Sequence, residues 1–408
     1  MIKHQAFFEF LAATDQASSA WSPVVAGLAA LRLTDARLEK EAQVEQDWAS
    51  VESVRSAVGA VNEGDPIRSI LMSLTEAASQ RELQRDVIGQ RLLSYGRALN
   101  FEGKWILACD VFETADNVAG VPLNPQITID ANIALGSAAR RLAAWDRSAE
   151  AYARAAHIAN AVGNSAAALS VDVRRAMTHV IRGNLPAAEA LISETLQHAR
   201  ASHFSDVIGL ALHARSSIAH HRGEYADAIH FAYEALEEMG DSVERDAVLS
   251  DIAAAFGGMR MNDAARDGYL IVSATSQSQW LRWQATINLM ELASIDGNAQ
   301  EFDRYADELR SAALDPRLRT WYYLLLGQGQ QRFNRTAEAE TSLASAISIA
   351  EQNELHQIAH EARVAMTSLK SNEKARREVV NAPADIDPSL RWIVSELSSM
   401  RESALANP

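Results

Sequence analysis

Histidine pairs at helical spacing are the residues of this chain best suited by type to metal chemistry. His213 and His220 are seven residues apart, and His356 and His360 are four apart, so each pair occupies one face of a helix. Neither pair has a clear third ligand, and the segment from His356 to His360 lacks the glutamate of the zinc-protease motif. We therefore expect surface or groove histidines, with no metal site and no cofactor.

Other catalytic motifs are missing from the sequence. Gly257-Gly258-Met259 is not followed by the Lys-Ser/Thr of a phosphate-binding loop, and no Gly-x-Ser-x-Gly elbow occurs. The single cysteine, Cys109, falls inside an expected helix, where a buried and unreactive thiol is the usual outcome. We expect a protein that is not an enzyme.

The charge balance excludes several classes of partner. The chain has 408 residues and a formal net charge of −15, whereas nucleic-acid binders usually carry a basic face. No run approaches the ~18 apolar residues that are needed to span a bilayer. The apolar N-terminal run is interrupted by Glu9 and Asp15 and is too short for a signal peptide. One cysteine allows no intramolecular disulfide, which fits a reducing compartment. We expect a cytoplasmic protein without nucleic-acid or membrane partners.

The composition favours helix throughout. Ala, Leu, Glu, Gln and Arg dominate, only 9 prolines interrupt the chain, and no stretch alternates apolar and polar residues for long enough to predict a sheet.

A pattern of glycine, aromatic and small residues returns every 40 residues. It starts with Gly103-Lys104-Trp105, followed by Ala108, Phe112 and Ala115. Such a pattern is typical of two antiparallel helices, in which the glycine ends the first helix, the small residue allows close approach and the large residue fills the space beyond it. The equivalents in the next three repeats are Trp145, Ser148, Tyr152 and Ala155; Gly183, Leu185, Ala188, Ile192 and Thr195; and Gly223, Tyr225, Ala228, Ala232 and Ala235.

This pattern resembles the tetratricopeptide repeat. That family also has a large residue followed by Gly on the first helix, as in Tyr95-Gly96, Leu135-Gly136 and Leu326-Gly327. The usual repeat has 34 residues, so the 40-residue spacing resembles the longer repeats of bacterial regulatory proteins.

The resemblance extends beyond the four regular repeats. A later repeat continues from Leu326-Gly327, and two less regular ones lie before it. The fold class we expect is all-α, a right-handed α-solenoid of about seven such helix pairs between roughly residues 86 and 353. The later positions are Asn334, Ala339, Leu343 and Ala346, and the irregular repeats run through Ala253, Ala265 and Tyr269 and through Ala293, Gly297, Phe302 and Ala306.

Residues 1–85 do not fit the repeat. They predict helices near Lys3–Ala13, Ser18–Leu33, Asp35–Val61 and Pro66–Gln80, with Asp35 and Asp65 as N-cap residues. This N-terminal helical bundle either caps the array or forms a module for dimerisation or effector contact. A helical bundle followed by about seven repeats resembles the Rap-type peptide-receptor proteins.

The C-terminal part continues beyond the repeats. We expect the array to occupy residues 86–370 and a polar linker to occupy residues 371–387. A last helix, residues 388–408, begins at Asp387-Pro388 and carries Leu390, Ile393 and Leu397 on one face. It either caps the open end of the solenoid or pairs with another chain, so a homodimer through the terminal helices stays open.

The resemblance also implies a binding surface, because the first helices of the pairs line a concave groove in this family. The side chains that it places in the groove are mainly cationic and hydrogen-bonding. They are Arg97, Ser137, Arg140, Arg141, Arg174, Met177, His213, Ser217, His220, His221, Gln328, Gln331 and Arg332.

These residues predict a non-enzymatic scaffold that binds a peptide or partner protein in the groove. Arginine engages carboxylates in two parallel hydrogen bonds, so an acidic or C-terminal peptide would fit. Two alternatives stay open. The charges could instead be solvated or paired within the chain, and the protein could be a regulator whose N-terminal bundle moves against the repeats when a peptide or effector binds.

Overall fold

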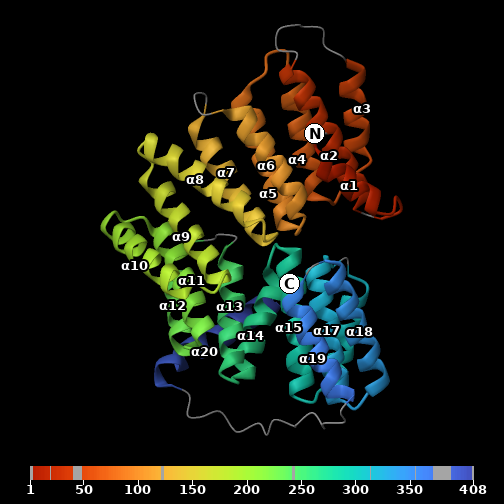
Figure 1. Ribbon diagram of the computed structural model, residues 1–408, viewed down its shortest axis with the longest axis vertical. Coiled ribbons are helices and arrows are strands. Elements are labelled where there is room, and N and C mark those ends of the chain that lie inside the picture. Colours follow the sequence, from red (N-terminus) through yellow and green to blue (C-terminus); the bar gives the residue numbers. More distant parts are fainter. Residues whose placement is uncertain are drawn as a thin grey trace. The chain divides into compact units, whose positions relative to one another are not determined.

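The computed structural model describes residues 3–18, 20–39, 48–120, 124–240, 244–312, 314–353, 355–370 and 387–406. All regular elements in these ranges are helical (Figure 1). Two compact units make up the chain, residues 1–191 (unit 1) and 192–408 (unit 2), and they divide within α10 (Leu185–Ala201). Over the described residues, no helix combines the length and apolar character needed to cross a membrane.

Seven antiparallel helix pairs follow one another, which confirms the all-helical solenoid architecture. The first member of each pair is termed the A helix and the second the B helix. The pairs are α5 (Arg85–Phe101) with α6 (Trp105–Ala119), α7 (Pro125–Arg141) with α8 (Trp145–Ala161), α9 (Ser165–Ile181) with α10, α11 (Ser205–Arg222) with α12 (Tyr225–Glu238), α13 (Glu244–Gly258) with α14 (Asn262–Thr275), α15 (Gln279–Ile295) with α16 (Ala299–Arg310), and α17 (Pro316–Arg332) with α18 (Thr336–Gln352).

The turns between A and B helices keep the 40-residue spacing in the backbone itself. Gly103, Ala143, Gly183 and Gly223 all have left-handed backbone, with φ of 78°, 56°, 76° and 76°. This conformation lets the chain leave the A helix and reverse at once, and glycine adopts it without steric cost. The alanine at the second of these turns shows that the turn, rather than the glycine, is the repeated feature.

The later pairs keep a register as well, but a shorter one. From Gly223 the next left-handed turn residues are Arg260, Gly297 and Asn334, each 37 positions after the last, with φ of 61°, 74° and 60°. The B helices explain the change, because α12 and α14 have 14 residues and α16 has 12, against 17 in α8 and α10. The two repeats that look irregular in the sequence are therefore regular pairs with shortened B helices.

In three of the pairs, α5 with α6, α7 with α8 and α17 with α18, close approach depends on a glycine of the A helix. A Cβ atom on Gly136 would lie 2.5 Å from Cε1 of Tyr152, and one on Gly327 would lie 2.7 Å from Cγ of Leu343; Gly96 faces Phe112 in the same way. The small residue also contributes a hydrogen bond, since the Ser148 hydroxyl donates to the carbonyl of Gly136 at 2.8 Å. The large residue, the small residue and the glycine thus form one contact, as the repeat pattern predicts.

Four helices precede the pairs in unit 1. They are α1 (Gln5–Ala13), α2 (Trp21–Glu39), α3 (Trp48–Gly59) and α4 (Pro66–Ser79), and α4 packs against α5. The Asp65 carboxylate accepts from the backbone N–H of Ile67, as expected of an N-cap residue. The expectation for Asp35 is wrong: α2 continues through it to Glu39, because its carboxylate is engaged by Lys3 and His4 rather than by the backbone. The predicted boundary at residue 85 stays a prediction.

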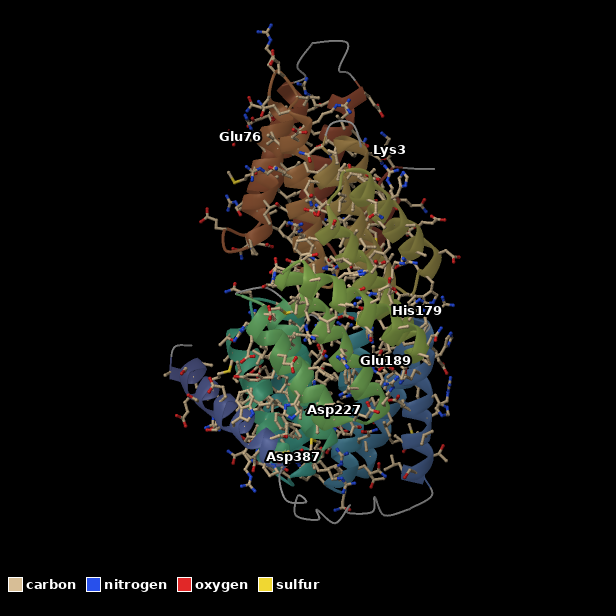
Figure 2. All side chains as sticks on the ribbon, turned by 90° about the vertical axis from the view of Figure 1, so that its left-hand side faces the viewer. Lys3, Glu76, His179, Glu189, Asp227 and Asp387 are labelled. Atoms are coloured by element: carbon tan, nitrogen blue, oxygen red, sulfur yellow. The ribbon has the colours of Figure 1, made fainter. Side chains whose placement is uncertain are left out.

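The C-terminal helix α20 (Arg391–Ala406) follows a short 3-10 turn, η1 (Pro388–Leu390), as predicted from Asp387-Pro388 (Figure 2). It does not extend the end of the array after α19 (His356–Lys370), but packs beside α14, with η1 against α12 (Figure 1). Leu390, Ile393 and Leu397 are fully buried there, which explains the placement. Arg401 also donates to Asp267 at 2.7 Å. The predicted linker lies outside the described residues except for Asp387.

Replacing Gly136 with alanine tests the contact that sets the spacing inside a pair. The added Cβ would overlap the Tyr152 ring, so we expect the free energy of unfolding of unit 1 to fall by about 1–3 kcal/mol. The matched control is Gly59→Ala in α3, where nothing lies within 4 Å of the added atom and the change should be neutral or slightly stabilising. Urea unfolding followed by circular dichroism measures both. Equal stability of the two variants would contradict the close-contact account.

Candidate functional site

Four of the predicted binding residues occupy one repeated position. Arg97, Ser137, Met177 and Ser217 are 40 residues apart on α5, α7, α9 and α11. Arg97 is exposed and the other three are half-buried. The Ser137 hydroxyl donates to the carbonyl of Ile133 and lies 3.1 Å from the Tyr152 hydroxyl, so it also contributes to packing with α8.

Several cationic side chains of unit 1 are engaged in contacts within the unit. Arg97 forms an ion pair with Asp130 of the next A helix at 3.5 Å. Arg141 stacks on the Trp105 ring at 5.4 Å from its centroid, and Arg182 stacks in the same way on Trp145 at 5.9 Å. Both stacks join the end of one A helix to the start of the preceding B helix, and the two tryptophans are 40 residues apart. The sequence shows both tryptophans, but the arginines that cover them come from neighbouring pairs.

Two side chains at another repeated position have unsatisfied polar atoms. Asn100 and Arg140 are 40 residues apart, near the C-terminal ends of α5 and α7, and these two A helices are in contact. Asn100 Oδ1 and Arg140 Nε are buried, and neither atom has a hydrogen-bond partner among the described residues. Nε of Arg174 on α9 is likewise buried without a hydrogen bond, although Arg174 makes another interaction. Buried polar atoms are normally paired, so these positions call for an explanation.

In unit 2 the predicted histidines face a carboxylate. His213 Nε2 on α11 lies 2.8 Å from the Asp251 carboxylate on α13, which links two successive A helices. Burial lowers the pKa of His220, and the nearby His221 adds to this effect while Asp251 opposes it. The His220 ring also meets the ring of Tyr225 edge-on, with centroids 5.3 Å apart. The hydrogen bond of His221 Nδ1 is to the carbonyl of Ser217.

The remaining predicted residues lie on α17. Arg332 is exposed and donates to the Ser294 hydroxyl of α15 at 2.7 Å, again linking successive A helices. Gln328 and Gln331 are half-buried on the same helix. Burial raises the pKa of the Glu291 carboxyl, against the opposing charge of Arg332. The structure thus brings His213, His220 and His221 together on α11, and it places the α17 residues in the same unit.

The remaining side chains that could bind a metal or act as a nucleophile do not form a common site. His356 and His360 are both exposed on α19, and no group of three or more His, Cys, Asp or Glu among the described residues could hold a metal ion. Cys109 is buried as expected, and burial raises the pKa of its thiol to about 11. Such a thiol is protonated and unreactive at neutral pH.

A buried charge cluster in unit 1 was not predicted from the sequence. His4 is only 7% exposed, and it lies between two carboxylates: Nδ1 is 2.5 Å from Asp110 on α6, and Nε2 is 3.2 Å from Asp35 on α2. Lys3, labelled in Figure 2, binds Asp35 at 3.2 Å and Glu39 at 2.8 Å. The partners lie up to 106 positions apart, so no local pattern could reveal them.

The two carboxylates keep His4 charged. Burial alone lowers the pKa of His4, but the hydrogen bonds and charges of Asp110 and Asp35 outweigh it and raise the pKa to about 9. In turn, His4 and Lys3 hold the pKa of Asp35 below its usual value despite burial. At neutral pH the cluster is therefore an ionic clamp that ties the N-terminal helix α1 to α2 and to the first helix pair.

Comparisons with known proteins give a fold likeness only. No family model matches the sequence, and no curated protein matches it. Among solved structures the chain is similar to a Rap protein crystallised in complex with competence and sporulation factor, with 12% identity and a TM-score of 0.48 over 87% of this chain and 99% of that one. The helical-repeat architecture is shown by the chain's own helices.

The charged state of His4 predicts a pH-dependent stability. The folded-state pKa of about 9 lies above the unfolded value near 6.5, so the stabilisation is complete below pH 6.5 and is lost as the pH rises through 9. A shift of this size corresponds to roughly 3 kcal/mol. We expect the unfolding free energy of the wild type to fall over this range relative to that of His4→Gln, as measured by urea unfolding at a series of pH values.

The exposed His157 offers the matched control, and His157→Gln should keep the wild-type pH profile. A His4 imidazole that titrates near 6.5 in an NMR experiment would show that the clamp is not charged at neutral pH.

Proposed function

We propose that this chain is a non-catalytic binding protein that holds a polypeptide segment at the C-terminal ends of the A helices α5 and α7. The observation that carries the proposal is the pair of buried polar atoms at one repeated position, Asn100 Oδ1 and Arg140 Nε, which lack hydrogen-bond partners among the described residues. An unsatisfied buried group costs about 1–3 kcal/mol, so a ligand that satisfies both gains that free energy on binding.

The chemistry of the two atoms selects the class of ligand. Asn100 Oδ1 accepts a hydrogen bond, whereas Arg140 Nε donates one. A peptide group offers both an N–H donor and a carbonyl acceptor, while an ionised phosphate or carboxylate offers acceptors only. A polypeptide main chain or an amide side chain therefore fits both atoms, and a simple anion fits only Arg140.

The other predicted groove side chains on the A helices are engaged within the fold. Arg97 is paired with Asp130, and His213 contacts Asp251, so these side chains serve to join successive A helices. Charge pairs this exposed are screened by salt and contribute little to affinity. We infer a moderate dependence of binding on salt, with Arg140 as its main source.

A second function, that of a regulator, is favoured by the His4 clamp. Packing within the helix pairs is largely apolar, but α1 is joined to α6 through ions. Ionic contacts can be broken by a charge change or by a competing ligand with less cost than an apolar core. In this alternative, peptide binding and release of α1 are coupled, so His4→Gln would alter peptide affinity, whereas a passive binding protein would bind equally well with either residue.

The proposal is tested by changing Arg140 to methionine, which keeps the length of the side chain and removes its donors. Peptides are selected on the wild-type protein from a random display library, and their affinities are then measured by fluorescence polarisation. We expect roughly tenfold weaker binding by Arg140→Met, since one charge-assisted hydrogen bond is worth about 1.5 kcal/mol or more.

Arg55 on α3 supplies the matched control, because it is exposed and pairs only with Glu52 on its own helix. Arg55→Met removes the same charge and should bind like the wild type. Selected peptides that bind Arg140→Met as tightly as the wild type would refute the site, and a library that yields no binders would refute the function.

A further inference from the structure

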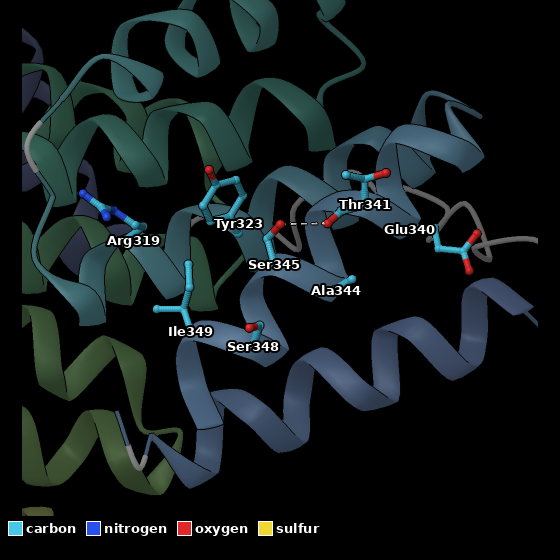
Figure 3. A pocket seen from close by; sticks show the side chains of 8 residues that line it. All are labelled: Arg319, Tyr323, Glu340, Thr341, Ala344, Ser345, Ser348 and Ile349. Atoms are coloured by element: carbon cyan, nitrogen blue, oxygen red, sulfur yellow. Dashed lines mark hydrogen bonds between the residues drawn. The ribbon is translucent and has the colours of Figure 1, made fainter. Parts of the chain in front are cut away.

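A hollow in unit 2 lies on α17 and α18, apart from Asn100 and Arg140 of unit 1. Its volume is about 720 Å³, and its lining includes Arg319 and Tyr323 from α17 and Thr341, Ser345, Ser348 and Ile349 from α18 (Figure 3). Because α17 and α18 are antiparallel, Arg319 near the start of one helix lies beside Ile349 near the end of the other. The hollow then runs along α18 toward Thr341.

The hollow has a cause in the packing of the preceding pair. The A helices α7, α9, α13 and α15 each pack broadly on the preceding B helix, but α17 packs mainly on α15 and makes only slight contact with α16. The B helix α16 has 12 residues, against 17 in α18. One side of α18, together with the first turns of α17, is therefore left without the neighbour that a full-length α16 would provide.

The hydrogen-bonding groups along the hollow differ from one end to the other. The hydroxyls of Thr341 and Ser345 donate to carbonyls of their own helix, Ala337 and Thr341, both at 3.0 Å, so their lone pairs stay available to accept. At the other end the exposed Arg319 has no partner among the described residues. A ligand that fits therefore carries an anionic group at the Arg319 end and N–H donors farther along.

We propose that this hollow binds an extended peptide segment whose carboxylate pairs with Arg319 and whose N–H groups donate to Ser345 and Thr341. An apolar side chain of the peptide would lie between Tyr323 and Ile349. The span from residue 341 to residue 349 of a helix is about 12 Å, which equals about four residues of extended chain. The Arg319 guanidinium engages a carboxylate through two parallel hydrogen bonds.

The net charge of the chain restricts the class of ligand further. A protein of net charge −15 repels polyanions, so a single carboxylate in an otherwise neutral peptide fits better than a nucleic acid or a strongly acidic segment. This site is independent of Asn100 and Arg140, which lie in unit 1. Its failure would leave the proposed function standing, and the reverse also holds.

The experiment uses the full-length chain and three pools of acetylated, randomised pentapeptides. One pool has free C-terminal carboxylates, one has C-terminal amides, and one has amides with a fixed internal glutamate. Peptides retained on the immobilised protein are identified, resynthesised and measured by isothermal titration calorimetry. We expect binders from the free-acid pool, the glutamate pool or both, and their difference tells whether the carboxylate is a chain end or a side chain.

Arg319→Met should weaken these binders about tenfold, as expected for loss of a charge-assisted contact. Arg317→Met is the matched control, because Arg317 is equally exposed two residues earlier on α17 and does not line the hollow; it should bind as the wild type does. A second variant, Ser345→Leu, fills the hollow from the other helix and should also abolish binding, while Arg140→Met should leave it unchanged.

Circular dichroism melting of each variant establishes that it is folded. Two results would overturn the proposal: plain amide peptides that are weakened by Ser345→Leu, or carboxylate peptides that bind Arg319→Met as tightly as the wild type. Absence of binders from both carboxylate pools would do so as well.

Discussion

The structure depends on a close contact inside the helix pairs, which in α5 with α6, α7 with α8 and α17 with α18 joins a glycine of the A helix to a large side chain of the B helix. The contact of Gly136 with Tyr152 fixes the separation of α7 and α8, and Ser148 reinforces it with a hydrogen bond to the Gly136 carbonyl. Two pairs later the equivalent hydrogen bond runs in the opposite direction, from the A helix to the B helix. There the Ser216 hydroxyl of α11 donates to the carbonyl of Ala228 on α12 at 2.7 Å. A left-handed residue one or two positions beyond each A helix then reverses the chain into the B helix.

A constant contact inside the pairs leaves helix length as the main variable between them. The three shortened B helices, α12, α14 and α16, change the spacing of the turns from 40 to 37 residues without changing the pair itself. Shortening also removes surface that would otherwise cover the next pair. At α16 this leaves α18 partly uncovered, while beside α14 the fully buried side chains of α20 occupy the surface. The length of the B helices thus determines which helix surfaces are covered by other helices of the chain.

The sequence predicts what is local and repeated. Gly103, Phe112 and their equivalents define the pairs because their contacts join residues less than 20 positions apart, and the repetition shows that the spacing is not accidental. Partners from different parts of the fold leave no such trace. Asp35 looks like an N-cap residue because its neighbours suit a helix start, but Lys3 and His4 engage its carboxylate and α2 runs through it. The basic groove was inferred from the groove positions that the repeat resemblance implies and from the residue types found there. The pairing of Arg97 with Asp130 shows why residue types do not give the net charge of a surface.

The distinction between paired and unpaired polar groups is what separates structure from function in this chain. Polar contacts that bridge successive A helices, such as His213 with Asp251 and Arg332 with Ser294, have their partners 38 residues away and stabilise the stacking of one pair on the next. A ligand that used them would have to break those contacts first, at a cost that offsets most of the gain. Asn100 and Arg140 hold polar atoms that the fold itself leaves unsatisfied, so binding there has no such cost. For this reason the proposed function depends on Arg140 more than on the cations that are already paired within the chain.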